Sequence, residues 1–403
     1  MLVVPAGSYR TTDFVIAAGD LRVDLVVASE GDLPMGDLGR SRSVTIDCNR
    51  SEWSASRIAN LKPTPDAVIA ADDRTVVIAA MASNMLGLAA NPVGAVSSTR
   101  DKAHMRGLLD NAGVPQPRYR LAASGEVAAL CAALGFPCVV KPRGLSASRG
   151  VIRVDTAEEA GIAEARIRRI IEEAGGDPDA TVVVEGFIPG PEVAVEGMLV
   201  RGELTVLALL DKPDRLDGPF FEETMFVTPS RHDSATQGEI TSVTQAATRA
   251  LGLVTGPIHA EVRCGPDGVM LVEIAARSIG GLCGRALSFG LLGESLESVI
   301  VRSALGLPGS GLDTATAATG VLMLPIPLAG KLVSIENVDD ALAVSGVTEF
   351  DQTIPNGKAV VPLPEGDRYL GFLFAQGASP DAVEQSLRTA HAKLTVRIDP
   401  EGR

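Results

Sequence analysis

The chain has few aromatic residues and no long apolar run. Of its 403 residues one is Trp and three are Tyr, although 46% are hydrophobic. No apolar run approaches the ~20 residues that a membrane-spanning helix needs. The N-terminus lacks the cationic region and long apolar stretch of a signal peptide. We therefore expect a cytoplasmic protein with no membrane partner.

Cysteine and basic residues are also scarce. The five cysteines are odd in number and form no CxxC pair, which argues against a disulfide or zinc framework. The formal net charge is −14 and there is no basic run. Because nucleic-acid binding relies on a cationic surface, we expect no nucleic-acid partner. Small molecules are the expected ligands.

Two common nucleotide-binding motifs are missing. The N-terminal part has no GxGxxG, and GxxxxGK[ST] occurs nowhere. The first 98 residues nevertheless alternate between β-rich runs, such as Leu2–Pro5 and Asp24–Ala28, and helical patterns such as Asp73–Leu88. That alternation predicts an α/β fold with a parallel sheet. Any nucleotide site in it is therefore neither an ordinary dinucleotide site nor a P-loop.

Two helices have recognisable starts. Ser98 or Thr99 can cap a helix over Arg100–Asn111. Thr156 starts a second helix over Ala157–Glu173, with Glu159 completing a capping box. Between them lie a strand over 137–142 and a glycine- and serine-rich loop over 143–150. A Gly/Ser/Thr-rich connector follows Leu307, and a helix over 380–393 closes a β-rich C-terminal part.

Glu261 and Glu273 stand equidistant from Asp267, in the turn Gly-Pro-Asp-Gly of a predicted hairpin. In a symmetric hairpin they face each other across the strands, roughly 5 Å apart at Cβ. Like charges repel, and magnesium, which prefers carboxylate and phosphate oxygens, would compensate them. A solvated pair neutralised by Arg263 and Arg277 is the alternative. Alternation places His259, Ala275 and Arg277 on the same face.

Lys141 ends an apolar strand and opens the loop 143–150, whose glycines and exposed amides suit a phosphate cover. Taken alone, such a loop is more often a turn. Lys102 lies on the capped helix and Lys212 at the end of another strand. Each lysine alone would more often be a surface residue.

Taken in order, these features resemble the ATP-grasp superfamily. The series is Lys102, Lys141 with its glycine loop, Glu185-Gly-Phe-Ile-Pro-Gly-Pro-Glu192, Glu261, and Glu273-Ile-Ala-Ala-Arg277. The segments SYRTTDF, DAVIAADDRTVVIAAMASNMLGL, DKPDRLDGPFFEETMFVTPS and PNGKAVVPLPEGDRYLGFLFA look most like the L-amino-acid ligase (dipeptide synthetase) branch. The resemblance covers nearly the whole chain.

The resemblance implies an ATP-grasp fold in four parts. These are an N-terminal Rossmann-like (pre-ATP-grasp) domain over 1–98, a linker helix with a small lid subdomain over 99–186, an ATP-grasp core with the metal site over 187–308, and a C-terminal α/β subdomain over 309–403. The last part would cover the active site and shape the substrate pocket. A homodimer is compatible with the sequence and nothing in it demands one.

The resemblance also implies roles for single residues. Lys102 and Lys141 would hold the ATP phosphates under a lid that includes Ser146, Ser148 and Gly150. Glu185, Gly186, Phe187 and Ile188 would form the hinge to adenine, and Glu192 would accept from the ribose. Glu261 and Glu273 would bind magnesium (or manganese), and Arg277 would neutralise the acyl phosphate, with the amides of Gly280 and Gly281 beside it. Lys212 would contact the γ-phosphate, and Glu222 would recognise the amino-acid substrate.

The implied activity is that of an ATP-dependent carboxylate–amine ligase that forms an amide or peptide bond through an acyl phosphate. One departure concerns the metal: many ATP-grasp enzymes have Asn where this chain has Ala275, which leaves the number of ions open. An ATP-grasp carboxylase, a carboxylate–thiol ligase and a non-catalytic nucleotide-binding protein are the alternatives. His232 and His259 are candidate bases for the amine by residue type only.

Overall fold

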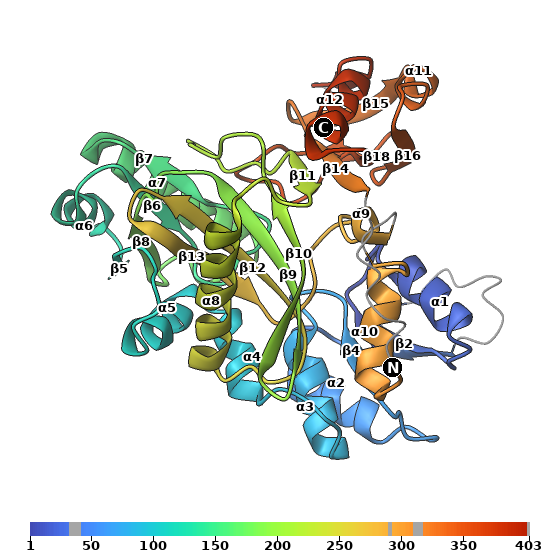
Figure 1. The fold of residues 1–403 in the computed structure, drawn as a ribbon. Helices are drawn as coiled ribbons and strands as arrows, with labels where there is room; N and C mark the ends of the chain where they lie inside the picture. Colours follow the sequence, from blue (N-terminus) through green and yellow to red (C-terminus); the bar gives the residue numbers. More distant parts are fainter. Residues whose placement is uncertain (32–41, 289–291, 309–316, 401–403) are drawn as a thin grey trace.

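The computed structural model describes residues 1–31, 42–288, 292–308 and 317–400, and within them four β-sheets (Figure 1). Helices and strands alternate throughout, so the predicted mixed α/β class is confirmed. The connector predicted after Leu307 falls mostly on 309–316, outside the described residues. In the described part of the chain no helix is long and apolar enough to cross a membrane.

The N-terminal sheet is parallel, with strand order β3-β2-β1-β4. Its strands are β1 (Leu2–Val4), β2 (Val26–Ser29), β3 (Arg42–Thr45) and β4 (Ile69–Ala70). Its helices are α1 (Thr11–Asp20), α2 (Ser51–Ala59) and α3 (Val76–Leu86). Strand β1 is fully buried, and Val3 packs against Ala28 and Ile78 in the core. The parallel sheet expected from the alternation of elements is present.

Two predicted helix starts were wrong. Helix α3 begins at Val76 and not at Asp73, whose side chain instead reaches Arg277. The helix expected from Arg100 is α5 (Lys102–Asn111), and its cap is Asp101, whose carboxylate accepts from the N–H groups of Ala103 and His104. Ser98 and Thr99 end the preceding helix α4 (Val93–Thr99). Their hydroxyls donate to carbonyl groups of that same helix and so are not available to cap the next one.

The part of the chain that the sequence predicts to be a lid, called the lid below, is an antiparallel sheet of order β5-β8-β6-β7 with two helices. The strands are β5 (Tyr119–Ala122), β6 (Cys138–Lys141), β7 (Ile152–Val154) and β8 (Val182–Gly186), and the helices α6 (Val127–Leu134) and α7 (Ala157–Glu173). Thr156 caps α7 as predicted, by accepting from the N–H of Glu159 at 3.2 Å. The Glu159 carboxylate accepts from the N–H of Asp155, one residue before the cap.

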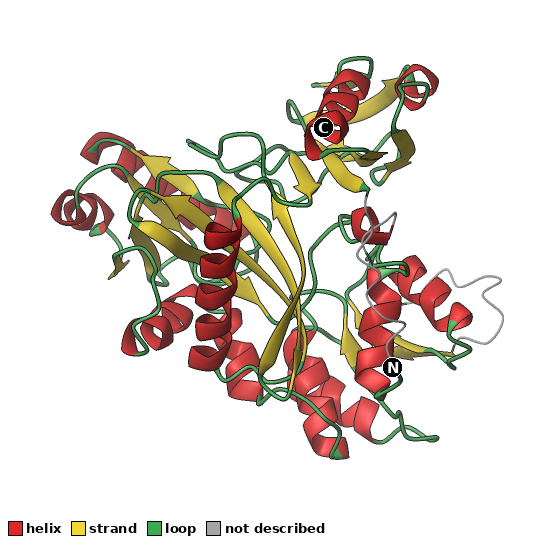
Figure 2. Cartoon of the chain, viewed as in Figure 1, coloured by secondary structure: helices red, strands yellow, loops and turns green. Residues whose placement is uncertain are grey.

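An eight-stranded sheet forms the centre of the molecule (Figure 2). Its strand order is β13-β12-β9-β10-β11-β14-β18-β16. The strands are β9 (Glu192–Val200), β10 (Glu203–Asp211), β11 (Met225–Thr228), β12 (Gly256–Gly265), β13 (Gly268–Ala275), β14 (Ala318–Leu324), β16 (Val347–Gln352) and β18 (Gly371–Gly377). Helix α8 (Ser234–Leu251) packs on β13 and β10. The sheet thus continues across residue 308, where the sequence predicts a domain boundary.

The C-terminal part adds a small sheet of order β17-β15-β19 beside the end of the central one. Its strands are β15 (Gly330–Glu336), β17 (Ala359–Val360) and β19 (Thr395–Asp399). The remaining helices are α9 (Arg285–Ser288), α10 (Leu296–Leu305), α11 (Val338–Leu342) and α12 (Pro380–His391). Helix α12 packs on β14 and β18 through Val383 and Leu387. The C-terminal part therefore covers one end of the central sheet.

Candidate active site

A cavity of about 410 Å³ lies where the N-terminal domain, the lid, the central sheet and the C-terminal part meet. Its walls are the loop after β1, residues 71–74 after β4, residues 145–148 of the lid loop 143–150, the segment 185–188 after β8, strands β12 and β13, and residues 367–369 before β18. Every part of the chain thus contributes to one site. Most of the residues selected from the sequence line it.

Lys141, at the end of β6, is buried and 2.8 Å from Glu185. The other oxygen of Glu185 accepts from Arg106 of α5 at 2.7 Å, and Arg106 also donates to the carbonyl of Val272. Burial alone would raise the pKa of Glu185, but the two cations outweigh it and lower the pKa to about 2. Glu185 is therefore a charged residue that positions Lys141 at the cavity wall.

Lys102 links the lid loop to the central sheet. Its ammonium donates to the carbonyl of Leu145 at 2.7 Å and lies 3.4 Å from Glu273. The N–H of Lys102 also donates to the carbonyl of Arg143, and the Arg143 guanidinium pairs with both oxygens of Asp101. Ala147 and Ser148 have positive φ angles of 56° and 54°, which turn the loop into the cavity. The loop thus has fixed ends and a sharply bent middle.

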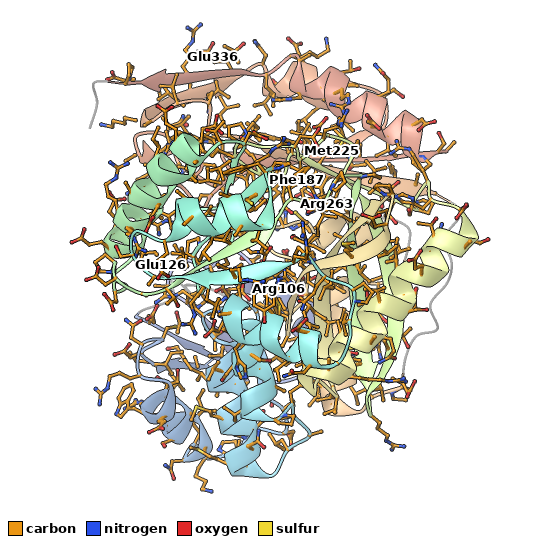
Figure 3. All side chains as sticks on the ribbon, turned by 90° about the vertical axis from the view of Figure 1, so that its left-hand side faces the viewer. Arg106, Glu126, Phe187, Met225, Arg263 and Glu336 are labelled. Atoms are coloured by element: carbon orange, nitrogen blue, oxygen red, sulfur yellow. The ribbon has the colours of Figure 1, made fainter. Side chains whose placement is uncertain are left out.

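The segment after β8 carries an aromatic ring between two guanidinium groups. The ring of Phe187 lies 4.4 Å from Arg153 and 5.0 Å from Arg263, and Phe187 and Arg263 lie side by side in Figure 3. Arg263 is buried and donates to Glu192 at 2.8 Å and to the carbonyl of Ile188 at 2.8 Å. The N–H groups of Gly186 and Phe187 already donate to protein carbonyls. These contacts hold the segment in place at the cavity wall.

Glu261 of β12 pairs with Glu273 of β13, as the sequence predicts. This pairing does not arise from a symmetric hairpin as expected, because the two-residue turn alone would place Glu261 opposite Val272. A bulge between Glu261 and Val262 skips Val272 and restores the pairing, with His259 opposite Ala275. Both glutamates are partly exposed and line the cavity. The two carboxylates therefore face the same space from neighbouring strands.

Lys212 lies behind this cavity wall, surrounded by three carboxylates. Its ammonium is 2.5 Å from Glu192 and 3.3 Å from Glu261, and it donates to Glu223. Burial opposes its charge, but the three carboxylates raise the pKa of Lys212 well above its usual value. Burial, assisted by the charge of Glu261, raises the pKa of Glu223 to about 7. The oxygens of these three glutamates lie within 4.8 Å of one another.

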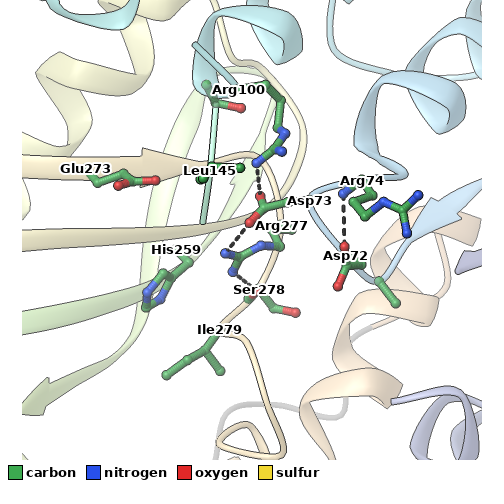
Figure 4. Close-up of polar contacts among 12 residues, drawn as sticks. Asp72, Asp73, Arg74, Arg100, Leu145, His259, Glu273, Arg277, Ser278 and Ile279 are labelled. Atoms are coloured by element: carbon green, nitrogen blue, oxygen red, sulfur yellow. Dashed lines mark hydrogen bonds and ion pairs between the residues drawn. The ribbon is translucent and has the colours of Figure 1, made fainter. Parts of the chain in front are cut away.

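Arg277 follows β13 and is fixed by the N-terminal domain (Figure 4). Its guanidinium donates to Asp73 at 2.7 Å and to the carbonyl of Ser278 at 2.8 Å. Arg100 lies 3.5 Å from the other oxygen of Asp73. Burial would raise the pKa of Asp73, but the two guanidinium groups lower it to about 2. Arg277 is thus held at the cavity by a charged partner from another domain.

The two histidines considered as bases, His232 and His259, lie in different surroundings. His259 lines the cavity, with one ring nitrogen 2.5 Å from Glu196 and the other 3.5 Å from Glu261. Burial would lower the pKa of His259, but the bonds and charges of these carboxylates raise it to about 9. It is therefore cationic at neutral pH and cannot accept a proton from an amine. His232 does not line the cavity.

Three selected residues do not line the cavity: Gly150, Lys212 and Glu222. Gly150 bonds to the C-terminal part, Lys212 lies behind the wall, and in place of Glu222 its neighbour Glu223 faces inward. Sequence reasoning gave no role to Asp73, Arg106 and Glu223, and it considered Arg263 only as a neutralising charge. For Asp73 and Glu223 the only signal in the sequence is that each belongs to a pair of adjacent acidic residues, Asp72-Asp73 and Glu222-Glu223. Such a pair does not indicate which of its two members faces the cavity.

The donor set fits ATP with magnesium. Lys102 and Lys141 supply cations to the cavity, and Glu261 and Glu273 supply hard oxygen ligands near them, with the Lys102 ammonium 3.4 Å from Glu273. Lys212, 3.3 Å from Glu261, already gives this carboxylate a positively charged partner within the protein. The positions of these lysines and glutamates are therefore compatible with binding of ATP phosphates and a magnesium ion.

Comparisons with known proteins agree with this geometry. Residues 134–286 match the ATP-grasp domain family, and residues 322–399 match L-amino acid ligase C-terminal domain 2. An alanine–anticapsin ligase of Bacillus subtilis is 26% identical over 233 residues, which are 53% of this chain and 49% of that protein. A formate-dependent phosphoribosylglycinamide formyltransferase of Sulfolobus acidocaldarius is 25% identical over 95% of this chain and 94% of that protein.

Among solved structures, an L-amino acid ligase from Bacillus licheniformis has the same fold. The TM-score is 0.82 at 23% identity, over 99% of this chain and 98% of that one. The chain spans between about half and three fifths of the length of the first curated relatives that it matches. The predicted ATP-grasp fold is confirmed, and the chain combines an ATP-grasp domain with an L-amino acid ligase C-terminal domain.

Proposed function

We propose that this chain uses ATP and magnesium to activate a carboxylate as an acyl phosphate and joins it to an amine, with an L-amino acid among its substrates. One observation carries the proposal. Lys102 and Lys141 line the same cavity as Glu261 and Glu273, in a chain whose ATP-grasp domain is followed by an L-amino acid ligase C-terminal domain. Phosphoryl transfer to a substrate carboxylate requires cations that bind the phosphates and protein carboxylates that hold a metal ion.

In this proposal Lys102 and Lys141 hold the phosphates of ATP, and the lid loop 143–150 covers them. The segment 185–188 holds adenine, and Glu192 accepts from the ribose. Glu192 is bonded to Lys212 and Arg263, so its free lone pairs would serve the ribose. Glu261 and Glu273 would hold magnesium, which would neutralise the charge on the transferring phosphoryl group.

Arg277 would bind the oxygens of the acyl phosphate through its planar guanidinium, whose geometry a lysine could not reproduce. Its bonds to Asp73 and Ser278 fix the orientation of that plane before substrate arrives. The lid and the C-terminal part enclose the cavity, which would protect an acyl phosphate from water. The amine must then attack the acyl carbon as its free base.

Arg368 suits a substrate carboxylate. It lines the cavity from the C-terminal part, and within the described residues it has no ion pair or hydrogen bond. A guanidinium binds a carboxylate with two parallel hydrogen bonds. We assign it to the free carboxylate of an amino-acid substrate.

The test is phosphate release from ATP and magnesium with pairs of L-amino acids, each amino acid also being tested alone. Release that requires one particular pair, with a matching dipeptide mass, supports the proposal. The variants Glu273→Gln and Arg277→Ala are expected to lose turnover by on the order of 10²-fold or more while staying folded. Near-normal turnover in either variant, or no ATP-dependent product with any pair, would overturn these assignments.

A further inference from the structure

The lid is fastened to the C-terminal part at one loop, residues 361–370, which we call the latch loop. Glu365 of this loop accepts two hydrogen bonds from Arg166 of α7, from Nε at 2.6 Å and from Nη2 at 2.9 Å. Arg169, three residues along the same face of α7, lies 3.6 Å from Glu365. One carboxylate therefore holds the outer helix of the lid.

The end of the phosphate-covering loop is fastened at the neighbouring residue. The N–H of Gly150 donates to the carbonyl of Pro364 at 2.9 Å. Gly150 has a φ of +72°, and a Cβ there would lie 2.8 Å from the ring of Pro142. Only glycine fits this approach without strain. The loop that would cover ATP and the helix behind it therefore depend on two consecutive residues of the C-terminal part.

The same loop lines the substrate side of the cavity. Asp367, Arg368 and Tyr369 all face it. Arg368 is three positions after Glu365, a span of at most ~10 Å. Between its two ends the loop makes a tight turn, in which the N–H of Gly366 donates to the carbonyl of Pro362 at 2.8 Å and a Cβ at Gly366 would lie 1.9 Å from the carbonyl oxygen of Val361.

The far end of the latch loop is fixed to the central sheet. The N–H of Leu370 donates to the carbonyl of Leu324 in β14, and the carbonyl of Tyr369 accepts from the hydroxyl of Thr353. The ring of Tyr369 packs 6.1 Å from that of Phe372. Because this end of the loop is fixed and Arg368 is only three positions after Glu365, a shift of Arg368 toward a bound substrate would be passed to the tight turn at Gly366 and to Glu365.

We propose that the latch loop couples the lid to the substrate pocket: Glu365 and Arg166 are positioning residues that keep the lid closed while the pocket is filled. This inference rests on the proposed ligase function for its catalytic consequence, but the latch itself is a property of the chain alone. The side chains of Arg166 and Glu365 are 35% and 20% exposed. A partly hydrated pair of this kind is strong enough to bias a lid and weak enough to open in each cycle.

The first test is amide hydrogen exchange of the protein without ligand. Glu365→Gln and Arg166→Gln are expected to speed exchange at Gly150 and in α7 by about 10-fold, with β12 and β13 unchanged. Glu336→Gln is the matched control, because it removes a carboxylate that pairs with Arg397 at 2.6 Å elsewhere in the C-terminal part. Unchanged exchange at Gly150 in both latch variants would overturn the proposal.

The second test counts phosphate released for each amide formed. The wild type and Glu336→Gln are expected to give a ratio near one, and Glu365→Gln a ratio several-fold higher, because an open lid exposes the acyl phosphate to water. The exchanged pair Arg166→Glu with Glu365→Arg should bring the ratio back toward one. A ratio unaffected by Glu365→Gln refutes the coupling. A wild type without any amide product refutes the ligase function and leaves the exchange test to decide the latch.

Discussion

Asp73 and Arg277 lie 204 positions apart in sequence and are bonded at 2.7 Å, one in the N-terminal domain and one after the central hairpin. Arg100 supports Asp73 from its other side. The residue that would meet the acyl phosphate is thus oriented by a part of the chain that holds none of the predicted ATP ligands. In the proposed function the N-terminal domain would therefore contribute to the chemistry as well as to the fold.

Asp73→Asn tests this contribution. The amide keeps the shape but removes the charge that fixes the Arg277 guanidinium, so we expect kcat to fall by about 10- to 100-fold and the KM for ATP to stay within about 3-fold. Steady-state kinetics with the substrate pair found in the screen measures both. Asp110→Asn, on the exposed side of α5, is the control. Equal rises in KM for all substrates would instead indicate a general structural loss.

Glu185→Gln should destabilise the protein. It leaves the fully buried Arg106 and the buried Lys141 without a counter-charge, which typically costs about 3–5 kcal/mol of the free energy of unfolding. The pKa of about 2 lies below that of an unfolded Glu, so this stabilisation is complete above about pH 4.5 and is lost as the pH falls toward 2. Urea unfolding at pH 7 and pH 3 measures it. The exposed Glu203→Gln should change stability by less than about 0.5 kcal/mol.

His259 gives stability the opposite dependence on pH. Its pKa of about 9 lies above the unfolded value of about 6.5, so its contribution is complete below about pH 6.5 and is lost as the pH rises through 9. The difference corresponds to about 3 kcal/mol. We expect the unfolding free energy of the wild type to fall relative to that of His259→Gln between these pH values. Parallel curves for the two proteins would contradict a charged His259.

Lys212→Met should create a site that needs a cation. Without the ammonium, Glu192, Glu223 and Glu261 repel one another in a buried cluster, and we expect a loss of about 3–5 kcal/mol. Millimolar magnesium should restore part of it, because a divalent cation neutralises two carboxylates. Thermal unfolding with and without magnesium measures the rescue. The exposed Lys358→Met should show neither effect, and a variant as stable as the wild type would contradict the cluster.

Local sequence patterns determined much of the fold. The alternation of β-rich and helical runs gave the parallel N-terminal sheet, and Thr156 with Glu159 marked the start of α7. The hairpin turn brought Glu261 and Glu273 close together, although a bulge after Glu261, and not the turn alone, made them direct partners. Such features depend on residues close in sequence, so they can be read without the rest of the molecule.

The tertiary structure decided which charges meet. Glu185 pairs with Arg106 and Lys141, Lys212 is shared by three carboxylates, and Glu365 holds Arg166 across 199 positions. The sequence around a charged residue contains no periodic pattern that identifies its ion-pair partner. Which charged residues form ion pairs depends on how the separate domains pack. The sequence by itself determined the set of groups that could hold ATP and magnesium. Only the packing of the domains determined their orientation and the latch that closes over them, because these are interactions between surfaces that form far apart along the chain.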